Sequence, residues 1–155
     1  MSVEWSTLQL LAETRAVDVW YLFPTGAVNR QLASSLDRVD HHKKRALSVI
    51  FGSDSWEEEV YRTEIVEDLF SERTTVGSKS FSLDQIEAFA KRRLETIFSY
   101  VSDPLPLLNE RDTKIFSLFC LSNSKSNQAI ALIAKGVASV QKKYGPAASR
   151  RKYGR

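Results

Sequence analysis

The fold class is indicated by one stretch, Val17-Asp18-Val19-Trp20-Tyr21-Leu22-Phe23-Pro24-Thr25-Gly26. Its β-branched and aromatic residues predict a strand, and the Pro-Thr-Gly turn marks the end of that strand. The run from Val19 to Phe23 is continuously apolar, which is typical of a strand covered on both faces in a parallel α/β sheet. We therefore expect an α/β protein with a parallel-type strand near its amino terminus.

The remaining sequence predicts helices and two further strands. Helices are expected over residues 6–14, 27–36, 41–51, 54–70, 82–101 and about 127–143. Two of them begin with a capping-box pattern, Ser6 to Gln9 and Ser82 to Gln85. Strands are expected at 105–108 and 115–121, joined by a short charged turn as an antiparallel hairpin, and residues 71–80 are expected to form a loop. The sum is about three strands and five or six helices, with residues 1–143 in a single domain.

A doubly covered strand normally has neighbours on both sides. Here only the later hairpin is available to pair with the strand that contains Val19, Trp20 and Tyr21. An apolar strand left at the edge of a sheet favours association with another chain. These three residues are therefore a candidate association edge.

The composition fits one soluble domain of 155 residues with a net charge of +3. One cysteine, Cys120, excludes an intramolecular disulfide, and with two histidines it argues against a closed zinc site. The longest uncharged run, Val19 to Asn29, has 11 residues, whereas a membrane helix needs about 20. We expect a cytoplasmic protein that does not contact a membrane and holds no metal.

The positive charge is concentrated at the carboxyl terminus. Residues 144–155 are expected to form a basic tail, and residues 142–155 contain no acid. The bases there are Lys142, Lys143, Arg150, Arg151, Lys152 and Arg155. The tail can be a solubilising terminus, or these bases can contact the phosphates of a nucleic acid.

Few residues suggest catalysis or nucleotide binding. The glycines are scattered and form neither a dinucleotide-binding nor a Walker-type loop. His41 and His42 are adjacent on an expected helix and so point about 100° apart, which favours a charged surface segment over a metal site. Cys120 lies in an apolar strand with no recognisable base beside it, which is typical of a small buried residue.

Two junctions between a strand and a helix could hold an anion through backbone N–H groups. The first follows the apolar strand, and because ligands of open α/β sheets lie beyond the carboxyl ends of the strands, it is the candidate pocket. Its expected lining residues are Asp18, Phe23, Pro24, Thr25, Gly26, Asn29 and Arg30. The second is Ser122 to Asn127, where Lys125 adds a charge, and Arg15 flanks the apolar strand. Both junctions can also be well-capped turns without a ligand.

Several of these segments resemble a known family. They are Trp5-Ser6-Thr7-Leu8, the run from Ala12 to Pro24, Val28-Asn29-Arg30, and Phe116 to Asn123 with the helix that follows. Together they resemble the carboxyl-terminal half of the three-Cys-motif partner proteins (TcmP). The resemblance implies a class I methyltransferase-like, Rossmann-like half-fold, with Val17–Phe23 as its fifth strand and the hairpin as its sixth and seventh. It also implies a partner protein that bears three cysteines, in a phage-associated or mobile-element context.

The family's cofactor motifs have no counterpart here. Its glycine-rich loop and its acidic-proline motif precede the block that begins at Trp5, and neither occurs in this sequence. We therefore expect a shortened, truncated family member that is inactive alone, has no cofactor of its own, and associates with itself or with a methyltransferase-like front half. The alternatives are a nucleic-acid-associated accessory module that uses the basic tail, and a split S-adenosylmethionine-dependent enzyme whose front half supplies the cofactor site. A remnant of an interrupted gene, without a function, is a further alternative.

Overall fold

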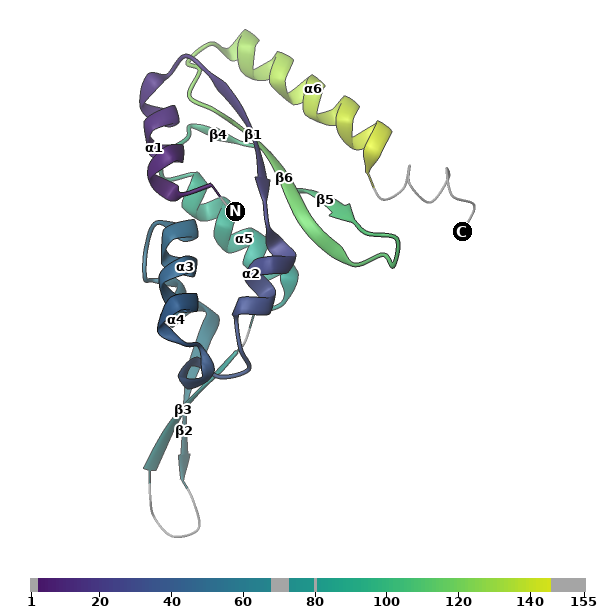
Figure 1. Ribbon diagram of the computed structural model, residues 1–155. Helices are drawn as coiled ribbons and strands as arrows, with labels where there is room; N and C mark the ends of the chain where they lie inside the picture. Colours follow the sequence, from purple (N-terminus) through teal and green to yellow (C-terminus); the bar gives the residue numbers. More distant parts are fainter. Residues whose placement is uncertain (1–2, 68–72, 80, 146–155) are drawn as a thin grey trace.

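The computed structural model describes residues 3–67, 73–79 and 81–145. The helices in this part of the chain are α1 (Trp5–Thr14), α2 (Thr25–Gln31), α3 (His41–Phe51), α4 (Trp56–Val60), α5 (Leu83–Leu94) and α6 (Asn127–Tyr144), with a 3-10 turn at Leu36–Arg38. The strands are β1 (Asp18–Phe23), β2 (Tyr61–Glu67), β3 (Arg73–Lys79), β4 (Tyr100–Val101), β5 (Leu105–Leu108) and β6 (Lys114–Ser122). The architecture is mixed α/β (Figure 1).

The longest strand, β6, is the centre of the main sheet. On one side it pairs along the full length of β1, from Asp18 opposite Ser122 to Phe23 opposite Ser117. On the other side it pairs with β4 and β5. Each of these pairings is antiparallel, so β1 and β5 run in the same direction with β6 between them.

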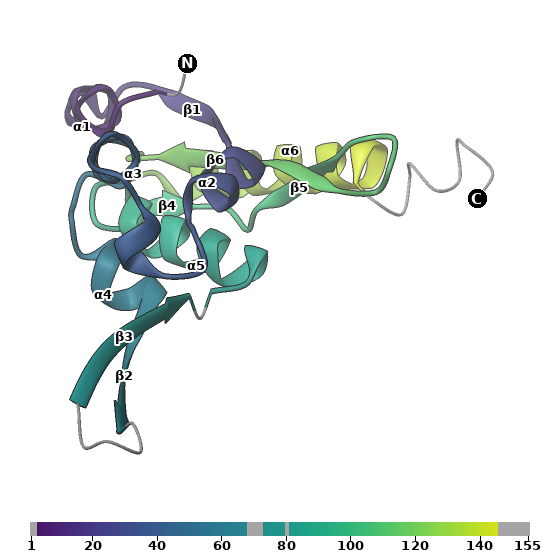
Figure 2. The ribbon, with the colours of Figure 1, turned by 60° about the horizontal axis from the view of Figure 1, so that its bottom comes forward.

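Helices cover the two faces of this sheet unequally. Apolar residues from α1, α2, α3 and α5 form one core cluster with the inward side chains of β1 and β6, which include Phe23 and Phe119. On the opposite face, α6 packs against β6 and lies apart from the other helices (Figures 1 and 2). Within α6 only Val137 is fully buried, so this helix is attached by a narrow apolar stripe.

A second, two-stranded sheet extends from the body next to α4. It consists of β2 and β3, paired antiparallel from Tyr61 opposite Lys79 to Glu67 opposite Arg73 (Figure 1). The prediction of a helix over 54–70 is therefore wrong at Tyr61–Glu67, and that of a loop over 71–80 is wrong at Arg73–Lys79, while the rest of both ranges beyond Val60 lies outside the described residues. β-branched residues such as Ile65 and Val76 favour strands, and the cross-strand pairing outweighs the acidic run that suggested a helix.

The prediction that Val19–Phe23 is covered on both faces is also wrong. Tyr21 and Phe23 are buried, but Trp20 is 47% exposed and Leu22 is 44% exposed. No parallel pair of strands occurs among the residues that the structure describes. The apolar run reflects one buried face and one apolar face open to solvent, a distinction that the residue types alone do not make.

Of the other element boundaries predicted from the sequence, some are confirmed by the structure and some are wrong. The helix over His41–Phe51, the hairpin of β5 and β6, and the capping box of Ser82 and Gln85 are confirmed. The capping box at Ser6 is wrong, because α1 begins one residue earlier, at Trp5, and has Glu4 as its N-cap. The helix expected over 82–101 spans only Leu83–Leu94, and β4 occupies the positions expected for its last turn.

Candidate functional site

The first candidate site is the open edge of β1. Among the described residues this strand pairs only with β6, so the backbone groups on its other side are not part of a sheet. Its residues from Val19 to Phe23 include neither a charge nor a proline, the features with which natural edge strands usually block pairing. The edge is therefore chemically suited to accept another strand.

The outward face of β1 continues this apolar character. Trp20 and Leu22 lie opposite Cys120 and Leu118 of β6 on the face that α6 covers only in part. Cys120 is buried, whereas the two β1 side chains are about half exposed. Of the other expected edge residues, Tyr21 points into the core and Val19 is partly buried against it. Tyr21 can therefore contribute only backbone groups to an association at this edge.

The expected pocket beyond the end of β1 is filled by protein atoms. Thr25 is fully buried and shares a hydrogen bond with the hydroxyl of Ser117, which in turn donates to Glu87. A Cβ on Gly26 would lie 3.1 Å from the carbonyl oxygen of Lys114, so glycine lets α2 approach β6 closely. The sequence placed Thr25 and Gly26 at a polar junction, and the structure fills that junction with a buried hydrogen-bond network.

Lys114 lies between two carboxylates of this network. Lys114 Nζ lies 2.6 Å from Glu87 Oε2 and 2.7 Å from Asp84 Oδ1. Burial lowers the pKa of Lys114, but the hydrogen bonds to Asp84 and Glu87 outweigh it, so the net pKa is raised. Lys114 is therefore an ammonium ion at neutral pH and compensates the buried carboxylate of Glu87. Thr25, Ser117 and Glu87 are inaccessible, so this buried part of the network braces α2, α5 and β6.

The other predicted pocket residues differ in their exposure and, for Asp18, in their position. Phe23 is in the core, Pro24 and Asn29 are partly buried, and Arg30 is exposed. Asp18 is exposed at the opposite end of β1, next to the last residue of β6. Thr25 and Gly26 are the predicted pocket residues that pack directly against β6 at this junction.

The candidate nucleophile and metal ligands remain isolated. Burial raises the pKa of the Cys120 thiol, and the nearby Asp18 carboxylate raises it further, so the thiol is protonated at neutral pH. The rings of His41 and His42 lie 3.8 Å apart at the exposed start of α3. Within the described ranges, no three His, Cys, Asp or Glu side chains lie together as a metal site requires.

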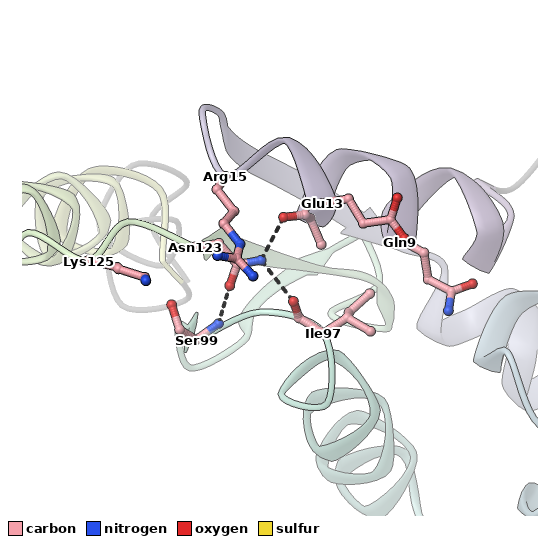
Figure 3. A pocket seen from close by; sticks show the side chains of 8 residues that line it. Gln9, Glu13, Arg15, Ile97, Ser99, Asn123 and Lys125 are labelled. Atoms are coloured by element: carbon pink, nitrogen blue, oxygen red, sulfur yellow. Dashed lines mark hydrogen bonds between the residues drawn. The ribbon is translucent and has the colours of Figure 1, made fainter.

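A cavity of about 400 Å³ lies at the other end of the sheet, where β1 begins and β6 ends. It is formed by the end of α1, the loop before β4 and the connection from β6 to α6 (Figure 3). Ala12 and Ile97 form its apolar wall. Its polar lining residues are Gln9, Glu13, Arg15, Ser99, Asn123 and Lys125.

Asn123 holds these three segments together. Its side-chain amide nitrogen donates to the carbonyl oxygens of Ala12 (3.0 Å) and Ile97 (2.9 Å), and its oxygen accepts from the backbone N–H of Ser99 (2.7 Å). The sequence singled out both Lys125 and Arg15 as flanking charges. It could not show that they share one cavity, because this follows from the antiparallel pairing of Asp18 with Ser122.

The basic carboxyl-terminal residues are only partly described. Lys142 and Lys143 are exposed in the last turn of α6. The expected contacts Arg150, Arg151, Lys152 and Arg155 lie outside the residues that the structure describes. In the described part of the chain, none of the helices has the length and apolar character needed to span a membrane.

Comparison of the chain with protein-family models, with curated proteins and with solved structures gives no match.

Proposed function

We propose that this chain is an assembly module that completes a larger α/β sheet, without catalytic activity of its own. The observation that carries the proposal is the open edge of β1, which is uncharged from Val19 to Phe23, together with the half-exposed Trp20 and Leu22 on its outward face. A strand added beside β1 would pair with its free backbone groups, and the segments bound to it would cover this apolar face. The occupant is a methyltransferase-like front half, as the resemblance to the three-Cys-motif partner proteins implies.

Two features support an accessory role over independent methyl transfer. The sequence contains no glycine-rich cofactor loop. The position beyond the end of β1, where a ligand of an open α/β sheet would lie, is filled by Thr25, Ser117 and Glu87. Cofactor binding in the assembled protein would then depend on the front half.

The test measures complex formation by light scattering after size exclusion. The probe is the separately expressed front half of a three-Cys-motif partner protein, up to its acidic-proline motif. We expect a one-to-one complex that Trp20→Lys weakens at least tenfold, because the lysine places a charge in the newly buried face. Leu132→Lys is the matched control, since it places the same charge at an apolar side chain that is 72% exposed and belongs to α6 and not to β1.

Two outcomes would overturn this proposal. One is a mixture in which the two chains elute separately under all conditions. The other is a stable dimer of the chain alone that Trp20→Lys dissociates, which would assign the edge to a second copy. Calorimetry of the chain alone with S-adenosylmethionine is expected to show no binding, and tight binding would contradict the absence of independent activity.

A second candidate function is contact with nucleic acid through the carboxyl-terminal region. The observation that favours it is charge: residues 127–155 contain seven Lys and Arg and no acid. Such a region is attracted to phosphate backbones whatever their sequence, and its binding weakens as salt rises. This function depends on α6 and the residues after it, so it is compatible with assembly through β1.

A further inference from the structure

The cavity at the start of β1 is lined by two cations and one acid, which leaves an excess of positive charge. Arg15 approaches from the end of α1 and Lys125 from the connection to α6, and both charged ends point toward Asn123 and Ser99 (Figure 3). Within the described residues, neither cation forms an ion pair. By contrast, Lys43, Lys44, Lys91, Arg92 and Lys114 each have a carboxylate partner.

The backbone fixes one of these cations in an uncommon conformation. Arg15 ends α1 with φ 52° and ψ 17°, in the left-handed region that non-glycine residues seldom adopt. Its N–H donates to the carbonyl oxygen of Ala12, the same residue that Asn123 holds. These contacts fix the backbone from which the Arg15 side chain extends into the cavity.

The floor itself is rigid and already satisfied. The three hydrogen bonds of Asn123 use both polar atoms of its amide, and the hydroxyl of Ser99 donates to the carbonyl oxygen of Ser122. Arg15 and Lys125 therefore remain as the unpaired cations of a preformed depression. The volume of about 400 Å³ is within the range of about 300–1,000 Å³ of small-molecule sites.

We propose that this cavity binds the phosphate group of a small anionic molecule, with Arg15 and Lys125 on either side of the phosphate. A guanidinium presents paired N–H donors to phosphate oxygens, and a lysine adds a mobile point charge. Glu13 lines the same cavity and opposes an anion, so it limits affinity and leaves a net charge of +1 from the three ionised side chains. The site lies at the opposite end of β1 from Pro24 and does not depend on assembly through the strand edge.

The experiment titrates the full chain with inorganic phosphate and, separately, with a nucleoside monophosphate at constant ionic strength. Amide chemical shifts of Arg15, Ser99 and Lys125 report binding. We expect saturable shifts in these residues with either probe, whereas chloride at the same ionic strength gives none. Saturation with inorganic phosphate alone identifies the free ion as the ligand, and saturation with the nucleotide alone identifies a phosphate ester.

Variants test whether each charged side chain favours or opposes phosphate binding. Arg15→Asn is expected to weaken phosphate binding at least fivefold without loss of stability, because asparagine tolerates the left-handed conformation. Lys125→Gln should weaken it similarly, and Glu13→Gln should strengthen it two- to fivefold. Lys135→Gln, at an exposed position on α6, is the matched control and should change nothing.

The proposal is overturned by shifts that do not saturate with either probe. It is also overturned by binding that Arg15→Asn and Lys125→Gln leave unchanged, or that Lys135→Gln weakens equally. The result of the phosphate titration does not depend on whether the front half binds, since no variant in this series alters Trp20 or Leu22.

Discussion

Two buried tyrosines differ in one hydrogen bond. The hydroxyl of Tyr21 has no partner among the described atoms, while that of Tyr61 donates to the carbonyl oxygen of Ala33 at 3.0 Å. An unpaired buried hydroxyl costs about 1–3 kcal/mol, and a satisfied one contributes about 1 kcal/mol. We expect Tyr21→Phe to raise the free energy of unfolding by about 1 kcal/mol and Tyr61→Phe to lower it by about as much. Urea denaturation measures both changes. A change in the free energy of unfolding in the same direction for the two variants would contradict the structure.

At the scale of an element, α6 combines weak attachment with unbalanced charge. Its residues include Lys135, Lys142 and Lys143 and no acid, and all three lysines are exposed. For a fluorescent single-stranded DNA we expect affinity to fall steeply with salt, and the double variant Lys142→Gln/Lys143→Gln should reduce the slope of log K against log salt by about 1.4. Lys91→Gln on α5 is the control, because Lys91 is engaged with Asp103 at 2.6 Å. A slope that this double variant does not alter would exclude α6 from the contact.

At the scale of the whole molecule, the protein is expected to lose stability at alkaline pH. Burial raises the pKa of Tyr21 to about 12; burial, with a smaller contribution from Glu57, does the same for Tyr61. The pKa of Lys114 is also raised, by its carboxylate partners. A group whose pKa is higher in the folded than in the unfolded state stabilises the fold while it is protonated. Its full contribution to the free energy of unfolding is present below the unfolded pKa, near 10. This contribution is lost as the pH rises toward the pKa of the folded state. We expect ionisation of Tyr21 to lower the free energy of unfolding by about 2 kcal/mol between pH 9 and 12, and ionisation of Tyr61 to lower it further.

Denaturant titrations at pH 8, 10, 11 and 12 measure this loss, and Tyr21→Phe should make the decline shallower. A profile that is flat through pH 12, or identical in the variant, would contradict burial of the Tyr21 phenol.

Local signals in the sequence determined several elements. The capping box at Ser82, the helix that Gly52 ends in a left-handed conformation, and the hairpin of β5 and β6 each depend on a few neighbouring residues. The apolar run from Val19 to Phe23 likewise specified a strand whatever its neighbours. These features were predictable because their free energy comes from contacts between residues close in sequence.

Only the tertiary structure decided which face of β1 is buried, since both alternating sets of side chains are apolar and the choice depends on where α1, α3 and α6 pack. It also turned Tyr61–Glu67 into a strand, because a strand requires a partner that local sequence does not specify. The same holds for the cavity, where antiparallel pairing brings Arg15 and Lys125 together although more than a hundred residues separate them. The sequence by itself determined the residue chemistry and the local elements of this protein, and long-range pairing decided which of those residues meet.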